Sequence, residues 1–360
     1  MKIAVIGGGN GGYAAAADLT FHGHKIFFWQ RSIKNTKKLI KKNNTIIMQD
    51  HNGKKKVKIY KVCTTLEQAV KNVKIVIILL PAFTQKEISK KISSILSNEQ
   101  IIFLPPGSFG SWIFANESSK NNKHNIYFAE SGTLPYLARK KDINTISIIT
   151  RATRLPTGVY PKNKFMKVIK ILKTIYPSIE YCGDILSAAL MNAGPIIHPP
   201  LIILNVGPLE HFSTWDIHNE GTQTSIKKVI YALDSERIKL RKKLSYKAPH
   251  FPLSDHYNSK GEEWMYGNSA HKNLKISKNW REHIDLNNHR YILEDIKIGL
   301  SFMYSIAEWL KIKVPITSSL LDIGSILLGE DIKKAGRTLT NLNINNLSIL
   351  ELKNKLNGGK

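Results

Sequence analysis

The 360-residue sequence has only two cysteines, Cys63 and Cys182, which stand far apart in the chain. Two lone thiols build neither a disulfide framework nor a thiolate metal cluster, so we expect no metal site. A chain of this length buries enough apolar surface to fold without such crosslinks. The scarcity of cysteine is typical of a reducing compartment, and we expect a cytoplasmic protein.

Long hydrophobic runs are also missing. The longest ones, such as residues 75–80 and 101–104, are far shorter than a membrane span. Residues 1–6 are too short to form the hydrophobic core of a signal peptide. We therefore expect no membrane partner and no targeting segment.

Acidic residues are scarce relative to basic ones, because 27 Asp and Glu stand against 53 Lys and Arg, a net charge of +26. Such a charge is typical of proteins that bind nucleic acid or a membrane surface. Here the lysines are scattered and greatly outnumber the arginines, whereas specific nucleic-acid readers rely on arginine forks and stacked aromatics. We expect no specific nucleic-acid partner, and a charge that attracts anionic substrates.

The order of apolar segments predicts two domains. Short apolar strands at 2–6, 25–29, 75–80, 101–104, 126–128 and 143–149 alternate with helical patterns. This alternation predicts a Rossmann-type, doubly wound parallel sheet over residues 1–180. Residues 181–360 show helical patterns at 186–203 (interrupted by prolines), 224–244, 291–310 and 315–328, and a frayed tail at 354–360. The fold class is therefore α/β, with an all-α second domain.

A glycine-rich turn follows the first predicted strand. Its sequence, Gly7-Gly8-Gly9-Asn10-Gly11-Gly12, fits the dinucleotide-binding fingerprint through Gly7, Gly9 and Gly12. The helix that follows would direct its amide hydrogens and the positive end of its dipole toward the pyrophosphate. The alternative is an ordinary turn between a strand and a helix.

The end of the second predicted strand distinguishes the two nicotinamide cofactors. An acid at this place binds the ribose 2′-hydroxyl of NAD, whereas an arginine accommodates the 2′-phosphate of NADP. The sequence has Gln30-Arg31-Ser32 here, with Lys34 nearby. We therefore predict NADP, with NAD as the alternative if Arg31 only stacks on the adenine.

His198 lies in an apolar segment at the head of the second domain, 191–200. Histidine suits proton transfer near neutral pH, and a catalytic histidine commonly has a carboxylate that orients it. The pattern also fits a buried structural histidine. The candidate carboxylates are Glu220, Asp234, Glu236 and the pair Glu294 and Asp295.

The chain carries a series of short motifs in a characteristic order. They are the 7–12 turn, Leu80-Pro81-Ala82, Pro106-Gly107, 130–139, Ile197-His198-Pro199, Glu220-Gly221, Asp234-Ser235-Glu236-Arg237, 287–295 and Gly336-Arg337-Thr338-Leu339. Through these motifs nearly the whole chain resembles the opine dehydrogenase family, which includes octopine, nopaline and N-(1-carboxyethyl)norvaline dehydrogenases. The resemblance implies an NAD(P)-dependent enzyme of amino acid metabolism that acts on CH–NH groups. Such an enzyme joins a 2-oxo acid reductively to the amino group of an amino acid, or catalyses the reverse oxidation.

The resemblance also implies roles for individual residues. It makes His198 the acid–base residue, Asp295 its orienting carboxylate and Arg290 the partner of a substrate carboxylate. It adds Leu80 and Pro81 to the cofactor-binding set, which further comprises Gly7, Gly9, Asn10, Gly11, Gly12 and Arg31. Arg290 and Asp295 would share one face if their segment is helical, and an arginine fork matches a carboxylate. The alternative for Arg290 is a surface ion pair with Glu294.

Some substrate contacts stay open at this point. Certain relatives have an asparagine four residues before the histidine, where this chain has Gly194. Asn192 is the substitute candidate, although on a helix its side chain would point elsewhere. Thr133 follows a late strand of the first domain and is a candidate 2-oxo acid contact. Amino-donor selectivity is expected in 246–280, with Trp264, Tyr266 and His256.

Three alternatives remain. Ketopantoate reductase-like and glycerol-3-phosphate dehydrogenase-like enzymes rely on a lysine at the head of the second domain, and residues 183–187 contain none. A non-catalytic dinucleotide-binding protein would keep His198 and Asp295 apart and gather its lysines in one stripe. The expected partners are small molecules, and the oligomer that we consider is a homodimer.

Overall fold

The computed structural model describes residues 1–258, 260 and 264–359. The chain forms two compact units, which are described separately. The N-terminal unit comprises Met1–Ala189 with Leu356–Gly358, and the C-terminal unit comprises Leu190–Lys355 with Gly359. The sequence predicted a boundary at residue 180, whereas these units divide after Ala189.

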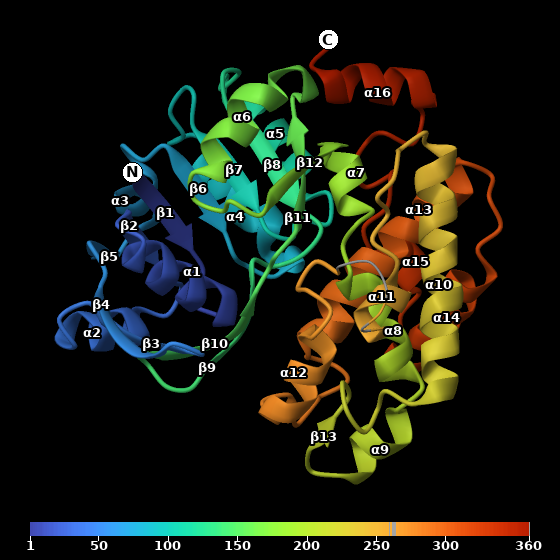
Figure 1. The fold of residues 1–360 in the computed structure, drawn as a ribbon. Helices are drawn as coiled ribbons and strands as arrows, with labels where there is room; N and C mark the ends of the chain where they lie inside the picture. Colours follow the sequence, from blue (N-terminus) through green and yellow to red (C-terminus); the bar gives the residue numbers. More distant parts are fainter. Residues whose placement is uncertain (259, 261–263, 360) are drawn as a thin grey trace. The chain divides into compact units, whose positions relative to one another are not determined.

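An eight-stranded sheet forms the centre of the N-terminal unit (Figure 1). Its strand order is β12-β11-β8-β7-β6-β1-β2-β5. The paired strands run parallel, except that β11 is antiparallel to β8. The strands are β1 (Lys2–Ile6), β2 (Lys25–Trp29), β5 (Lys61–Cys63), β6 (Ile75–Ile78), β7 (Ile101–Leu104), β8 (Tyr127–Ser131), β11 (Leu155–Tyr160) and β12 (Ile179–Asp184).

Helices connect these strands and cover the sheet. They are α1 (Asn10–Phe21), α2 (Ile33–Lys41), α3 (Leu66–Val70), α4 (Gln85–Ser93), α5 (Gly110–Lys120), α6 (Phe165–Lys173) and α7 (Ile185–Ala189). Alternate strand residues such as Ala4, Val76 and Ile102 form a core with Ile92 of α4 and Phe114 of α5. The predicted doubly wound fold is confirmed, but the sheet is not all parallel, because β11 and β12 run antiparallel to the other strands.

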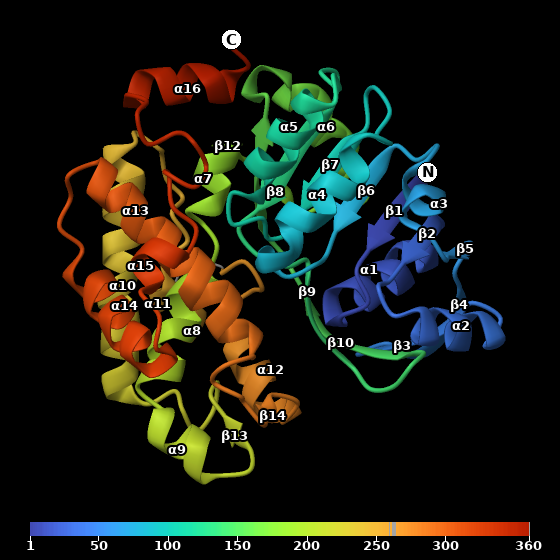
Figure 2. The same cartoon turned by 180° about the vertical axis from the view of Figure 1, so that it is seen from behind.

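A second sheet, which the sequence analysis missed, packs against α1 (Figure 2). Its order is β4 (Gly53–Lys58), β3 (Thr45–Asp50), β10 (Thr145–Arg151) and β9 (Tyr136–Lys140). The segment 143–149 was predicted for the parallel sheet, and it instead forms most of β10. Strand β10 pairs in parallel with β3 and antiparallel with β9. Residues of β10 alternate between buried and half-buried, which differs from the continuous burial of a central parallel strand.

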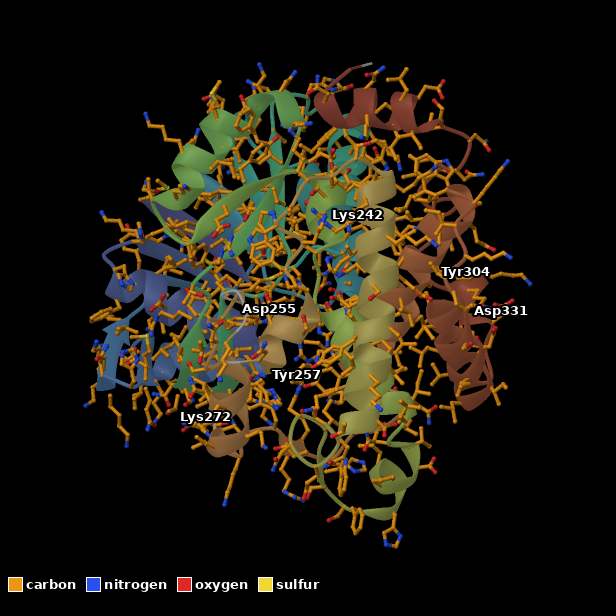
Figure 3. All side chains as sticks on the ribbon, turned by 45° about the vertical axis from the view of Figure 1, so that its right-hand side comes forward. Lys242, Asp255, Tyr257, Lys272, Tyr304 and Asp331 are labelled. Atoms are coloured by element: carbon orange, nitrogen blue, oxygen red, sulfur yellow. The ribbon has the colours of Figure 1, made fainter. Side chains whose placement is uncertain are left out.

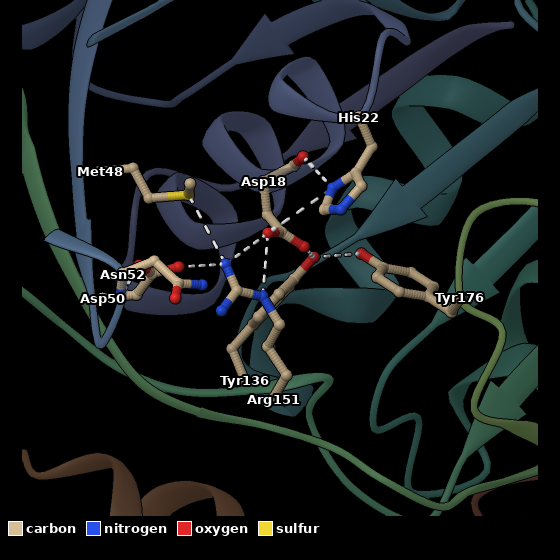
Figure 4. Close-up of polar contacts among 8 residues, drawn as sticks. All are labelled: Asp18, His22, Met48, Asp50, Asn52, Tyr136, Arg151 and Tyr176. Carbon is tan, nitrogen blue, oxygen red and sulfur yellow. Dashed lines mark hydrogen bonds and ion pairs between the residues drawn. The ribbon is translucent and has the colours of Figure 1, made fainter. Parts of the chain in front are cut away.

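A buried ion-pair network ties α1 to this second sheet (Figure 4). One oxygen of Asp18 accepts hydrogen bonds from Nε and Nη2 of Arg151, at 3.0 and 2.7 Å. The other accepts the Tyr136 hydroxyl at 2.9 Å, and Arg151 also reaches Asp50 at 2.8 Å. Burial chiefly raises the pKa of Tyr136, and the nearby Tyr176 and Asp18 raise it further. The network holds the helix that begins at the glycine turn against a rigid support.

The C-terminal unit is helical, as predicted, apart from a two-stranded ribbon of β13 (Trp215–Asp216) and β14 (Arg281–Glu282). Asp255 and Tyr257 project from α11, and Lys272 projects from α12 (Figure 3). The helices are α8 (Gly194–Ile203), α9 (Val206–His211), α10 (Thr224–Lys243), α11 (Leu253–Tyr257), α12 (Ala270–Ser277), the π-helix η3 (Tyr291–Leu300), α13 (Ser301–Trp309), α14 (Pro315–Leu328), α15 (Ile332–Ala335) and α16 (Ile349–Asn357).

Two sequence expectations about this unit were wrong. The helical pattern at 186–203 is interrupted between α7 and α8, just before Pro195, as predicted, but helix α8 continues through Pro199 and Pro200, where a second interruption was predicted. The tail predicted as frayed is helical up to Asn357. Among the described residues, the segment Ile185–Ile203, which contains α7 and α8, is long and apolar enough to cross a membrane. Its apolar stretch is 89% buried inside the protein, and buried core helices pass the same test of length and composition.

Candidate active site

The glycine turn between β1 and α1 has a shape that only glycine permits. Gly7 has a φ of +142°, and a side chain there would collide with the carbonyl of Leu79. A side chain at Gly12 would collide with the carbonyl of Gly7, so α1 packs directly on the turn. At Gly9, by contrast, no described atom lies within 4 Å of where a Cβ would stand. This open cradle at a helix start fits a dinucleotide pyrophosphate.

The other predicted cofactor-binding residues surround this turn. Gly11 packs closely against the side chains of Leu79 and Leu134, since a Cβ added at this position would lie 3.2 Å from each of them. Leu79 directly follows β6, and its amide donates to the carbonyl of Ile6 at 2.8 Å. Leu80 and Pro81 come next in the chain. They therefore lie at the carboxyl edge of the sheet, where nucleotides bind in such folds. Thr133 is buried immediately before Leu134, and the Ser131 hydroxyl donates to its carbonyl at 2.7 Å.

The residues predicted to choose the cofactor have separate environments. Gln30 is buried beneath Gly8, and its Oε1 accepts a hydrogen bond from the Tyr13 hydroxyl at 3.5 Å. Arg31 is exposed. Ser32 caps α2, since its Oγ accepts the amide of Asn35 at 3.2 Å. Arg31 is therefore the exposed cation at the end of β2, while the Ser32 hydroxyl already has a structural task.

The C-terminal unit brings His198 and Asp295 together, although they stand 97 residues apart in the sequence. Nδ1 of His198 lies 2.6 Å from Oδ2 of Asp295. Both side chains are largely buried, with 14% and 8% of their surfaces exposed. Burial raises the pKa of Asp295, and the positive charge of Arg290 opposes this rise. A carboxylate in this position fixes the histidine tautomer and leaves Nε2 for a substrate.

Three of the other candidate carboxylates have structural partners. Glu220 pairs with Arg281 and accepts the amide of Asp216 at 3.1 Å. Asp234 binds Arg237 at 2.6 Å, and Glu236 accepts the amides of Ile316 and Thr317 at the start of α14. Asp295, by contrast, contacts His198 directly.

Aromatic rings that the sequence analysis did not identify surround His198. Tyr291 stacks on its ring at a centroid distance of 4.0 Å and an interplanar angle of 29°. His218 meets it edge to face at 5.6 Å, and Trp280 in turn packs against His218 at 6.4 Å. Tyr291 directly follows the predicted Arg290, but nothing in the sequence spacing indicates that His218 and Trp280 join this cluster.

Two glycines allow the helices of the site to approach closely. A side chain at Gly194 would collide with Oδ1 of Asp295, and one at Gly299 would collide with the ring of Pro195. An asparagine at position 194 therefore does not fit beside Asp295. Asn192 is buried nearby, and its Oδ1 accepts the amide of Gly194 at 3.1 Å. Asn192 precedes helix α8, which begins at Gly194, so the helical geometry assumed for it from the sequence does not apply.

Arg290 and Asp295 belong to an unusual stretch of backbone. The π-helix η3 begins directly after Arg290, and the amide of Ser301 donates to the carbonyl of Ile296 five residues earlier. Residues five apart share a face in such a helix, and π-helical turns are frequent at functional sites. The guanidinium carbon lies 5.0 Å from the centre of the Tyr291 ring. Burial alone would lower the pKa of Arg290, but Tyr291, Glu294 and Asp295 raise it above its usual value.

The stretch expected to select the amino donor is only partly described. Residues 259 and 261–263 lie outside the described residues. His256, Trp264 and Tyr266 are each at most 7% exposed. Burial lowers the pKa of His256 to about 3, with a further contribution from His271. His256 is therefore a neutral, buried side chain near pH 7, and its predicted role in donor selection stays a prediction.

The two units match different family descriptions. Residues 181–328 match "NAD/NADP octopine/nopaline dehydrogenase, alpha-helical domain". Residues 2–111 match "NAD-dependent glycerol-3-phosphate dehydrogenase N-terminus".

Several known proteins are also similar to this chain over nearly its whole length. An opine dehydrogenase of Arthrobacter sp. (strain 1C) is 24% identical over 353 residues, which cover 96% of each chain. A structure of octopine dehydrogenase in complex with NADH and agmatine has a TM-score of 0.74 at 17% identity and covers 100% of this chain and 98% of that one. A structure of NADP⁺-bound yersinopine dehydrogenase has a TM-score of 0.71 at 12% identity, covering 99% and 98%.

Proposed function

We propose that this chain is an NAD(P)-dependent opine dehydrogenase, an oxidoreductase of CH–NH groups that joins a 2-oxo acid reductively to the amino group of an amino acid, or catalyses the reverse oxidation; the similarities to opine and octopine dehydrogenases support this proposal. The observation that carries the proposal is the contact of 2.6 Å between His198 and Asp295. A cofactor-binding protein without catalysis has no need to bury this pair of ionisable side chains, because burying such groups is costly.

His198 is the proton-transfer residue in this proposal. Asp295 holds Nδ1, so Nε2 is the atom that exchanges a proton with substrate. In the reductive direction a protonated His198 donates to the substrate as the carbon–nitrogen bond is reduced, and in the oxidative direction the neutral ring accepts that proton. The bound nicotinamide supplies or accepts the hydride. The stacked Tyr291 ring keeps the imidazole in one plane.

Arg290 is the substrate-carboxylate residue in this proposal. Both proposed substrates are carboxylates, and a guanidinium can bind a carboxylate with two parallel hydrogen bonds. An arginine side chain stays protonated in proteins, and Tyr291, Glu294 and Asp295 raise the pKa of Arg290 further. Thr133 and Asn192 are the further substrate contacts that we propose.

The proposed cofactor is NADP, with NAD as the alternative. The glycine turn fits the pyrophosphate of both, so the choice depends on the end of β2. There Gln30 is buried and neutral, and Arg31 offers an exposed positive charge. Without an acid at this place, the 2′-phosphate meets no repulsion and gains a cationic partner.

The test is an amine-dependent oxidation assay. Purified protein is mixed with NADPH or NADH and with pyruvate, glyoxylate or 2-oxoglutarate, each combined with a panel of amino acids. We expect at least one pair of substrates to accelerate cofactor oxidation well beyond the 2-oxo acid alone. If no pair does so, the proposed reaction is wrong.

We also propose a cytoplasmic homodimer. Both cysteines are free thiols, which suits a reducing compartment. Light scattering of the purified protein tests the dimer, because a mass equal to a single 40.7 kDa chain would contradict it.

A further inference from the structure

A lysine of the second sheet lies beside the glycine turn. Lys140 is the last residue of β9, and its main-chain amide donates to Oδ1 of Asn10 at 2.9 Å. Asn10 is the first residue of α1, so this hydrogen bond fixes Lys140 against the start of the helix. Its half-buried ammonium lies over the ring of Tyr13, 3.6 Å from the ring centre.

Tyr13 connects this ammonium to the end of β2. The tyrosine ring packs edge to face on Phe28 at 5.2 Å, and its hydroxyl donates to Oε1 of Gln30 at 3.5 Å. Gln30 stands where an acid would bind the ribose hydroxyl in an NAD-specific site. Lys140 is therefore linked through Tyr13 to Gln30, the residue that directly precedes the exposed Arg31.

The charge of Lys140 lacks an ion pair among the residues that the structure describes. Partial burial lowers the pKa of Lys140, and Asp142 only partly offsets this effect. The aromatic ring stabilises the cation, but it is a weaker partner than an anion. A half-buried ammonium that lies over Tyr13, on the helix that begins at the glycine turn, and has no carboxylate partner among the described residues is suited to bind a phosphate.

We propose that Lys140 binds the phosphate on the adenosine ribose of NADP and so helps Arg31 select this cofactor. The inference rests on the NADP preference proposed above. The second sheet then has a function beyond support, because it brings a cation to the cofactor from a strand far outside the glycine fingerprint. The Asp18 and Arg151 network holds this sheet on α1 and thereby positions Lys140.

The experiment compares dinucleotide affinities in the absence of substrates, by titrating the fluorescence of NADPH and NADH with the full-length chain. We expect Lys140→Gln to raise the Kd for NADPH roughly tenfold or more, the size of a lost charge-assisted hydrogen bond, and the Kd for NADH less than about twofold. Lys140→Arg keeps the charge and should retain most of the preference. Lys56→Gln removes an exposed lysine from β4 of the same sheet and should change neither Kd.

A displacement assay with two fragments identifies the phosphate. Lys140→Gln should weaken the binding of adenosine 2′,5′-bisphosphate but not the binding of adenosine 5′-monophosphate. Equal loss of NADPH and NADH binding would overturn the proposal, because Lys140 would then serve the pyrophosphate or the fold. Unchanged Kd values would also overturn it. Lys140→Met keeps the side-chain stem over Tyr13 and should repeat the Gln result if charge is the cause. Since no substrate is present, either failure leaves the proposed reaction untouched.

Discussion

Replacing Asp295 by asparagine removes the charge that holds His198 while nearly preserving side-chain shape. The contact of 2.6 Å is short and the carboxylate is buried, so its charge acts on the imidazole with little screening by water. An amide in its place can donate to Nδ1, which stabilises the tautomer with the hydrogen on Nε2 and prevents that atom from accepting a proton. General acid–base catalysis typically contributes about 10²–10⁴-fold, and we expect kcat to fall by roughly 10²–10³-fold, or about 3–4 kcal/mol.

The assay measures kcat and kcat/KM for the amine-dependent reaction, with dinucleotide affinity as the second readout. Affinity for NADPH should stay within about twofold, because the glycine turn and Asp295 belong to separate units. The double variant with His198→Ala should be no slower than His198→Ala alone, since residues that act as a unit are not additive. Asp322→Asn, at an exposed ion pair on α14, is the control and should be near wild type. A loss below about threefold in Asp295→Asn would refute the assigned role.

Three further predictions follow from the same contacts. Arg31→Asp should reverse the preference from NADPH toward NADH by roughly tenfold or more, measured as the ratio of Kd values, and an unchanged ratio would remove Arg31 from cofactor choice. Arg290→Met should shift the acid limb of the pH–rate profile to higher pH. Arg290 lowers the pKa of Asp295, so its loss lets that carboxylate protonate at higher pH. Arg290→Lys should leave the limb in place and raise the KM for the substrate. A limb that stays in place in Arg290→Met would contradict this coupling. Asp18→Asn should lower the free energy of unfolding by about 2–3 kcal/mol in urea denaturation, since Arg151 loses its buried partner, and a change under about 0.5 kcal/mol would show that Asp50 suffices.

The central strands of the first domain could be predicted because each carries a short-range signal. Strands such as β1 and β6 are continuous apolar runs between turns, which is typical of strands buried on both faces. The second sheet has no such signal. Its β4 reads Gly-Lys-Lys-Lys-Val-Lys, a run that is stable as a strand only through its pairing with β3. The parallel pairing of β10 with β3 joins residues about a hundred positions apart, which local patterns do not encode.

The candidate site was predictable in its residue types more than in its geometry. The resemblance singled out Asp295 among five carboxylates, and the structure provides the physical reason by giving Glu220, Asp234 and Glu236 other partners. Asn192 was assumed to lie on a helix because the sequence does not reveal where helix α8 begins. The site rings His218 and Trp280 were missed because ring contacts depend on the tertiary packing of distant loops and helices. Lys140 was missed for the same reason, since it reaches the cradle from the second sheet.

The most direct test of the central claim is the mass of the product. The protein is incubated with NADPH, a 2-oxo acid and the amino acid that accelerates cofactor oxidation, and the mixture is analysed by mass spectrometry. The account predicts a secondary amine whose mass is the sum of both substrates, less one water and plus two hydrogens, and predicts that His198→Ala forms it at least about a hundredfold more slowly. A 2-hydroxy acid as the product, with the amino acid left unchanged, would contradict the account and identify a simple carbonyl reductase.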